Sequence, residues 1–273
     1  DFEIFKGIAC AMGVESEFTA QKTSDGWIKW LYMETRKKAL ALGLTMPSYE
    51  EFDDKGWFKF SDPKEKIVML EDFRKDPIKN RLKTPSGKIE IYSEVVANFG
   101  YQDCPGHAVW REPCEWLGNN QTKFPLHLIS NQPDNKLHSQ LDHGSHSRAN
   151  KIDGREPIRI NSLDATKRKL KSNDLVLVFN DRGSCLAAVV VDDDIRSGVA
   201  LMSTGAWYDP LDPSIVNSTC KNGNPNVLTP DKGTSSLAQG PIAHTCLVEI
   251  KLVNEPMPKV TAYDPPKIIR KDS

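Results

Sequence analysis

The sequence predicts an α+β protein in which a mainly helical first part precedes a closed β-barrel. Residues 1–120 carry apolar side chains at helical spacing, whereas residues 121–253 carry short β-type runs with turns between them. Several short strands at this spacing are typical of a barrel rather than of a doubly wound sheet. Residues 254–273, rich in proline and basic residues, are expected to form an extended or disordered tail.

Two helices are predicted in the first part from apolar spacing and from residues that start and stop helices. Residues 1–12 place apolar side chains near one helical face. A second helix is expected to be capped by Ser24 or Asp25 and to run to about Leu42, where Gly43 ends it.

Three further features of the first part follow from local patterns. The stripe of two tryptophans and a leucine at 27–31 favours core packing over a docking surface. Residues 50–63 are expected to form an irregular connection. The turn signal at 84–87 precedes an alternating run at 88–92, which predicts a strand.

The barrel is predicted from six runs of strand character. They are expected at 125–129, 157–160, 175–179, 184–191, 199–203 and 246–253. A turn at 180–183 joins two of them, and a short helix at 163–170 is expected to be capped from Asn161 or Ser162.

Composition narrows the classes of function. The 273 residues carry 36 basic and 37 acidic side chains, a net charge of -1, which argues against binding nucleic acid or a membrane surface. No apolar run reaches the roughly 18 residues that predict a membrane span. The chain opens at Asp1 inside a predicted helix and without a leader, so we expect a fragment of a longer protein. Six scattered cysteines without a C-x-x-C pair favour the cytoplasm and leave the periplasm open.

The densest group of polar side chains follows the first predicted strand, at residues 130–140. A loop of this kind suits a large polar ligand that carries phosphates and a heterocycle. Lys136 is expected to meet a phosphate, and Ser139 and Gln140 to bond sugar or base edges. A solvated surface loop is the plainer alternative.

Other candidate segments are less specific. His138, His143 and His146 could hold a metal, but Gly144 argues against a helix that would bring them together. An amide such as that of Asn226 can bond a purine edge or any buried carbonyl. The two aromatics at 207–208 could line a channel or pack in the core. The sequence contains no P-loop, dinucleotide fingerprint or nucleophile elbow.

Seven segments together resemble one family. The chain is similar to the C-terminal region of the dimethyl sulfoxide reductase family, in order and in spacing, at 130–133, 136–141, 154–157, 178–183, 205–210, 224–229 and 237–240. Within that family, residues 139–145 are most similar to the biotin sulfoxide reductases, with the trimethylamine-N-oxide reductases as near neighbours. The resemblance implies a barrel of the double-psi type that binds molybdopterin guanine dinucleotide. Residues 1–120 would then be the end of a preceding α/β domain.

The resemblance also implies site residues, carried over by matching position. Lys136 stands where the family usually has Arg, and a lysine cannot make the planar bidentate contact. The other expected cofactor contacts are Ser130, Asn131, Gln132, Pro133, His138, Ser139, Gln140, Asn226, Ala243 and His244. No catalytic residue and no molybdenum ligand is expected in this chain, because the family's metal ligand, a serine in this branch, lies far upstream.

The expected function is that of a cofactor-binding C-terminal portion. The cofactor would be molybdenum bis(molybdopterin guanine dinucleotide), and the reaction a two-electron reduction of biotin sulfoxide, methionine sulfoxide or trimethylamine N-oxide. The expected partners are the missing N-terminal portion, the oxide substrate and an electron donor protein, and the chain alone is expected to be inactive. The alternatives are a stand-alone barrel interaction module and a histidine-based metal hydrolase. The cofactor-binding hypothesis requires the loops around 130–140 and 224–244 to meet at one barrel mouth.

Overall fold

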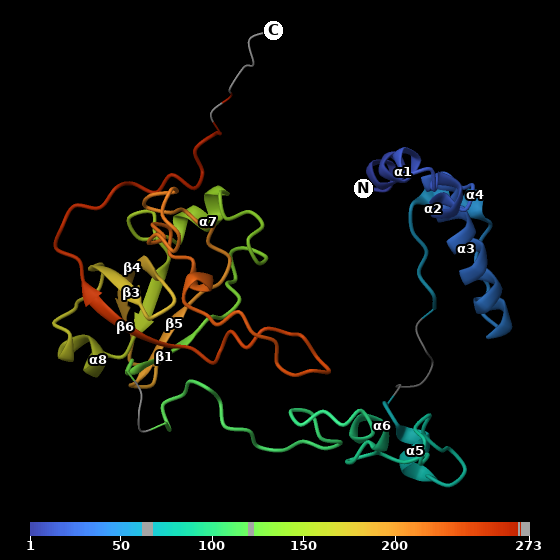
Figure 1. Ribbon diagram of the computed structural model, residues 1–273. Coiled ribbons are helices and arrows are strands. Elements are labelled where there is room, and N and C mark those ends of the chain that lie inside the picture. The colour runs from blue at the N-terminus through green and yellow to red at the C-terminus, as the bar shows by residue number, and fades with distance from the viewer. Residues whose placement is uncertain (62–67, 120–122, 267, 269–273) are drawn as a thin grey trace. The chain divides into compact units, whose positions relative to one another are not determined.

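The computed structural model describes residues 1–61, 68–119, 123–266 and 268 (Figure 1). Contacts divide the chain into two units, 1–88 and 89–273, and each is described by itself. The predicted domain boundary between residues 120 and 121 lies outside the described residues. So do residues 62 and 63 of the predicted connection and residues 267 and 269–273 of the predicted tail.

The first unit is helical. Its described helices are α1 (Phe2–Ala11), α2 (Glu15–Thr19), α3 (Ser24–Ala41), α4 (Tyr49–Lys55) and α5 (Glu71–Lys75). The predictions of α1 and α3 are confirmed, but the cap of α3 is Thr23, one residue earlier than expected. The Thr23 hydroxyl accepts the amide of Gly26 at 3.1 Å, which satisfies one of the free donors at the helix start.

The core of this unit differs from the one expected. Trp30 and Leu31 are 45% and 56% exposed, so the prediction that their stripe packs in the core is wrong for this unit. The buried face of α3 instead carries Tyr32, whose ring stacks on Phe52 at 4.4 Å between centroids. Phe52 belongs to α4, which forms where an irregular connection was expected. A capping box between Ser48 and Glu51 starts that helix.

The predicted strand at 88–92 is absent. The turn before it is confirmed, since the Gly87 amide donates to the Thr84 carbonyl at 2.9 Å. Ile89 and Ile91 are 65% and 87% exposed, and no described strand pairs with them. Alternation alone does not hold a strand without a partner. The short helix α6 (Glu94–Ala97) follows instead.

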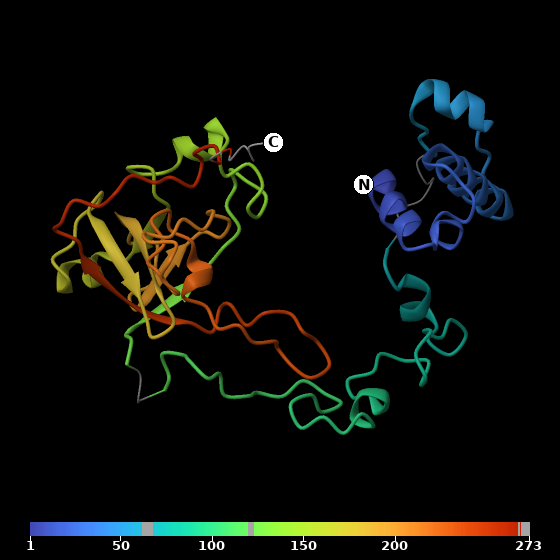
Figure 2. The ribbon, with the colours of Figure 1, turned by 45° about the horizontal axis from the view of Figure 1, so that its top comes forward.

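The second unit contains a closed barrel of mixed strands, drawn in Figures 1 and 2. Among the described residues the strand order is β1-β5-β2-β4-β3-β6. The pairs β1·β5 and β2·β4 are parallel, and the other neighbours are antiparallel. All six predicted strands are confirmed, with the following bounds: β1 (Leu126–Ile129), β2 (Pro157–Ile160), β3 (Leu175–Phe179), β4 (Ser184–Val191), β5 (Val199–Met202) and β6 (Leu247–Leu252).

The barrel interior is filled by aliphatic side chains that alternate along the strands. Each such buried side chain contributes about 1.5–3 kcal/mol relative to an exposed one. Those exposed by 2% or less include Leu126, Leu128, Ile158, Ile160, Val176, Val178, Val189, Val248 and Ile250. The connections carry α7 (Ser145–Ala149), α8 (Ser162–Lys167), which Asn161 caps as expected, and the 3-10 turn η1 (Pro225–Val227).

Strand directions decide where the loops lie. Because β1 and β5 run parallel as neighbours, the loops after them leave from one end of the barrel. Strand β6 runs antiparallel to β1, with Leu247 opposite His127. The segment that enters β6 therefore lies at that same end.

Candidate functional site

A pocket opens at the end of the barrel where these loops meet. Its volume is about 640 Å³. It is lined by four segments that are distant in the sequence: Ser130, Gln132, His138 and Ser139; Thr204 to Tyr208; Asn224 and Asn226; and Pro241, Ala243 and His244. The two loops that were required to meet at one barrel mouth do so.

The first two segments touch along their backbones at Gly205. Its φ of +97° lies in the region that favours glycine, and a Cβ atom there would overlap the carbonyl oxygen of His138. Next to it, the Thr204 amide donates to the Asn131 carbonyl at 2.9 Å. The Ser203 hydroxyl donates to the Asn131 side chain at 3.1 Å. Asn131 thus joins the two loops rather than lining the pocket.

Trp207 lines the pocket, which settles the choice between core and lining that the sequence left open. Its indole N–H donates to the Ser139 carbonyl at 2.7 Å, and its ring lies 5.3 Å from that of His143. Its backbone amide donates to Asp142 at 3.0 Å. Three separate contacts therefore fix this side chain at the pocket wall.

The lining of this pocket combines apolar surface with hydrogen-bonding groups. The residues that line this pocket include hydroxyl, amide and imidazole groups but no Asp, Glu, Lys or Arg. A second cavity of about 390 Å³ shares Tyr208, Asn224 and Asn226 with it and extends to Arg182. The two cavities share three residues and together offer hydrogen-bonding groups that suit a large polar ligand, and the guanidinium of Arg182 in the second cavity is paired with Glu115.

The segments that form this site belong to a part of the chain that matches known proteins. The model of the molydopterin dinucleotide binding domain matches residues 126–247, which include strands β1 to β5 and the pocket loops and end at the first residue of β6. A dimethyl sulfoxide/trimethylamine N-oxide reductase of Cereibacter sphaeroides is 41% identical over 98% of this chain and 33% of its own length. A trimethylamine-N-oxide reductase of Salmonella typhi is 42% identical over 97% of this chain and 32% of its own.

The chain belongs to the dimethyl sulfoxide/trimethylamine N-oxide reductase family of molybdopterin enzymes. It corresponds to the C-terminal part and spans about a third of the length of the curated relatives that it matches. Among solved structures, acetylene hydratase from Pelobacter acetylenicus shares the fold. Its TM-score is 0.65 at 17% identity, over 92% of this chain and 32% of that one.

Seven of the residues predicted to contact the family's cofactor line the pocket. They are Ser130, Gln132, His138, Ser139, Asn226, Ala243 and His244. Asn131, Pro133, Lys136 and Gln140 do not line it. Asn217 and Arg182 of the adjoining cavity were not predicted as site residues. The Asn-Asp-Arg-Gly turn that holds Arg182 was predicted as a turn and lies in a segment that resembles the family, but no role in the site was predicted for it.

Lys136, which was predicted to contact a phosphate, does not line the pocket. Its side chain is fully buried, and its ammonium donates to Asp142 at 2.8 Å and to Glu156. Lys151 pairs with the same carboxylates at 3.2 and 2.7 Å. Two buried cations therefore balance two buried carboxylates, and charges are tolerated in the interior when paired in this way. The ammonium of Lys136 therefore binds these carboxylates and is not available to a ligand in the pocket.

Asp142 is the centre of this buried group. Burial alone would raise its pKa, but the hydrogen bonds from Lys136, the Trp207 amide and Tyr263 outweigh burial and hold the pKa well below its usual range. Burial and the hydrogen bond to Asp142 raise the pKa of Tyr263. The carboxylate therefore stays ionised and the phenol protonated across the physiological range.

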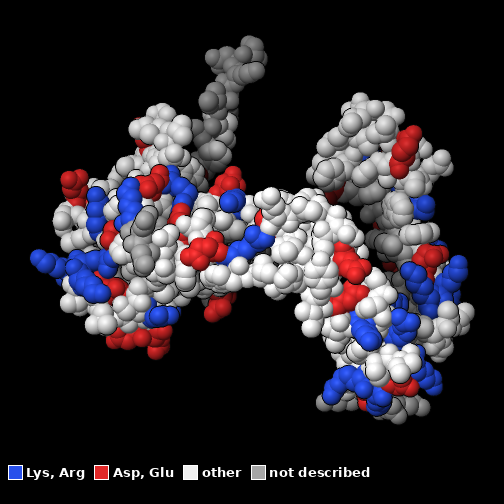
Figure 3. All heavy atoms as spheres, turned by 60° about the horizontal axis from the view of Figure 1, so that its bottom comes forward, with Lys and Arg blue, Asp and Glu red and all other residues white. Residues whose placement is uncertain are grey.

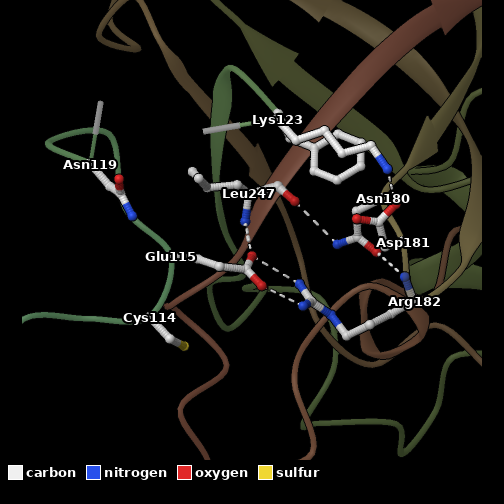
Figure 4. A pocket seen from close by; sticks show the side chains of 9 residues that line it. Cys114, Glu115, Asn119, Lys123, Asn180, Asp181, Arg182 and Leu247 are labelled. Carbon is white, nitrogen blue, oxygen red and sulfur yellow. Dashed lines mark hydrogen bonds and ion pairs between the residues drawn. The ribbon is translucent and has the colours of Figure 1, made fainter. Parts of the chain in front are cut away.

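Arg182 of the β3–β4 turn is held by the segment that precedes the barrel (Figure 4). Its guanidinium donates twice to the Glu115 carboxylate, once at 3.0 Å. Glu115 also accepts the Leu247 amide at 2.8 Å. Burial would raise the pKa of Glu115, but these donors lower it. The pair fixes Arg182 next to the pocket that Asn224 and Asn226 line.

The histidine metal hypothesis is not supported. Among the described residues, no group of three or more potential ligands lies close enough to hold a metal ion. His138 faces Gln132, His143 lies against Trp207, and His146 belongs to α7. That helix begins directly after Gly144, where no helix was expected.

The charged side chains on the surface show no strong excess of one sign. On the face drawn in Figure 3, basic and acidic side chains are interspersed, in keeping with 36 against 37 in the sequence. In the part of the chain that the structure describes, we find no helix with the length and apolar character needed to cross a membrane.

Proposed function

We propose that this chain holds the guanine dinucleotide part of a molybdenum bis(molybdopterin guanine dinucleotide) cofactor in an S-oxide or N-oxide reductase. One observation carries the proposal. Residues predicted as cofactor contacts from two loops nearly a hundred residues apart line a single pocket. The relatives' names point to dimethyl sulfoxide and trimethylamine N-oxide. Biotin sulfoxide and methionine sulfoxide belong to the same substrate class.

The donor set of the pocket fits such a cofactor. Ser130, Ser139 and Gln132 offer hydroxyl and amide groups that would bond phosphate and sugar oxygens, and Asn226 would bond a pterin or base edge. The absence of carboxylates from this lining avoids repulsion of the phosphates. When bound, the cofactor supplies the metal and dithiolene that carry the redox chemistry. The chain's own residues bind and orient it.

The cofactor assignment is tested by measuring the molybdenum and guanine nucleotide that the assembled enzyme contains. The enzyme is assembled from this chain and the N-terminal portion of the same protein, and molybdenum and acid-released GMP are measured per protein. Asn226→Ala is expected to lower both several-fold. Asn254→Ala, at an exposed position after the barrel, is the matched control and is expected to change neither. Full retention of GMP and molybdenum in Asn226→Ala would contradict the assignment of the pocket.

The substrate class is tested with the same assembly. With a reduced viologen as electron donor, biotin sulfoxide, methionine sulfoxide and trimethylamine N-oxide are compared. Reduction of at least one of them is expected, and the chain alone is expected to reduce none. Inactivity on all three with cofactor bound would remove the assigned substrate class.

A further inference from the structure

The segment after β6 returns along the barrel and passes close to α7 (Figures 1 and 2). We call residues 258–263 of it the C-terminal strap. The Pro258 carbonyl accepts Arg155 at 2.8 Å. Thr261 donates to Asp209 through its amide at 2.6 Å and through its hydroxyl at 2.8 Å. The strap is therefore fixed to the barrel at several points, and residues 262 and 263 form a turn.

Tyr263 of the strap reaches the buried charge group below the pocket. Its hydroxyl donates to Oδ2 of Asp142 at 2.7 Å. The same oxygen accepts the backbone amide of Trp207 at 3.0 Å and the side-chain amide of Asn222 at 3.2 Å. The other oxygen of Asp142 faces Lys136 and Lys151. Each acceptor of this carboxylate is thus satisfied, and Tyr263 supplies one of the donors.

Trp207 lies on the other side of this network. Its backbone amide is bound by Asp142 and its carbonyl by Asn222 at 3.0 Å, so both polar backbone groups depend on residues that Tyr263 also contacts. Its indole holds the Ser139 carbonyl, and Trp207 and Ser139 both line the pocket. Tyr263 itself does not line it. The path from strap to pocket wall is therefore Tyr263, Asp142, Trp207, Ser139.

We infer that Tyr263 is a positioning residue, which sets the pocket wall by holding Asp142 in the orientation that binds the Trp207 amide. The inference deepens the proposed function and rests on it for the nature of the ligand. A carboxylate that loses a donor can turn toward its remaining partners, since buried charged groups seek full hydrogen bonding. Without the hydroxyl, the Trp207 amide would lose its acceptor more often, and the wall at Ser139 would loosen.

The substitution Tyr263→Phe in the full chain tests this. It removes the hydroxyl and keeps the ring, which lies 5.7 Å from that of Trp207. Amide hydrogen exchange is measured residue by residue without ligand. Exchange at Trp207 is expected to accelerate about tenfold, the effect of losing one hydrogen bond to a charged group. Exchange at Leu186, whose amide bonds to Cys220 inside the barrel, is expected to stay within twofold.

Two comparisons separate positioning from general destabilisation. Tyr32→Phe removes a phenol hydroxyl that donates to the Pro47 carbonyl in the first unit, and it is expected to leave exchange at Trp207 unchanged. If Tyr263→Phe accelerates Trp207 and Leu186 equally, the hydroxyl serves only overall stability and the inference is overturned. Unchanged exchange at Trp207 overturns it as well.

Guanosine diphosphate provides the second readout, because it carries the guanine and diphosphate of the proposed cofactor. Its dissociation constant is expected to rise about three- to tenfold in Tyr263→Phe and to stay unchanged in Tyr32→Phe. If the unaltered chain does not bind guanosine diphosphate, the assignment of the pocket to the dinucleotide fails, while the exchange data still decide the role of Tyr263. If the nucleotide binds equally well to both proteins, control of the pocket by Tyr263 is refuted and the proposed function stands.

Discussion

The backbone of Gly205 lies so close to the His138 carbonyl that no side chain fits between them. This contact brings the loop after β1 against the loop after β5 at the pocket. We expect Gly205→Ala to destabilise the barrel by about 3 kcal/mol, because it combines an unfavourable φ with a steric overlap against backbone. Urea unfolding of the second unit measures the loss.

Gly7 is the control for that substitution. It lies inside α1 with no atom within 4 Å of the position of an added Cβ. Gly7→Ala is expected to stabilise the first unit by about 0.5–1 kcal/mol, since alanine has the higher helix propensity. Equal effects of the two substitutions would show that the Gly205 contact does not constrain the loops.

The ion pair of Glu115 with Arg182 makes the free energy of unfolding of the barrel depend on pH. The folded-state pKa of Glu115 is lowered from its ordinary value of 4.5. A lowered pKa contributes stability that is present above that ordinary value and is lost as the pH falls through the folded value. We therefore expect the free energy of unfolding of the barrel to fall below about pH 4.5.

Glu115→Gln isolates this contribution. The variant is expected to be less stable than the unaltered protein at pH 7. The difference between the two should shrink as the pH falls below 4.5 and through the lowered folded-state pKa of Glu115, because the carboxylate that forms the ion pair is then lost. Urea unfolding at a series of pH values measures it. A difference that stays constant from pH 7 to pH 3 would exclude Glu115 as the group responsible.

Lys136 is expected to matter for stability through its buried partners. Lys136→Met leaves Asp142 and Glu156 with Lys151 as their remaining cation, and loss of one partner from a buried charge group costs about 3–5 kcal/mol. Chemical denaturation checks this. Lys123→Met removes the exposed pair with Asp181 and is expected to cost less than about 1 kcal/mol. A stable Lys136→Met protein that merely loses cofactor would restore the phosphate contact inferred from the sequence.

The barrel could be predicted strand by strand because its interior imposes a pattern on the sequence. Runs such as Leu175–Phe179 alternate between buried and partly exposed positions, and turn residues stand between the runs. The alternation at 88–92 was of the same kind but found no partner among the described strands, so pattern alone misled there. Strand pairing is a property of the whole sheet and cannot be predicted from a five-residue segment alone.

The site was predictable only in part, for a related reason. Ser139 and Asn226 were candidates from the chemistry of their side chains, and the family resemblance then assigned them to the cofactor. The parallel pairing of β1 with β5 explains why their loops converge. The partners of Lys136 were not predicted, because Glu156 is 20 residues away in the sequence and becomes a neighbour only in the fold. Burial of a charge depends on such distant partners and leaves no local pattern.

The reactivity of the cysteine thiols is expected to show whether the barrel interior is shielded from solvent. Burial raises the pKa of Cys246 to about 11, although Arg182 counteracts it. At pH 8 only about one thiol in a thousand is then the reactive thiolate, and the buried Cys185 has its pKa raised as well. Iodoacetamide is expected to label the exposed Cys10 and Cys114 within minutes and to spare Cys246 until the barrel unfolds. Mass spectrometry of tryptic peptides reads the order. Labelling of Cys246 in the folded protein at the rate of Cys10 would mean that the interior next to Arg182, whose guanidinium contacts the Cys246 sulfur, opens to solvent.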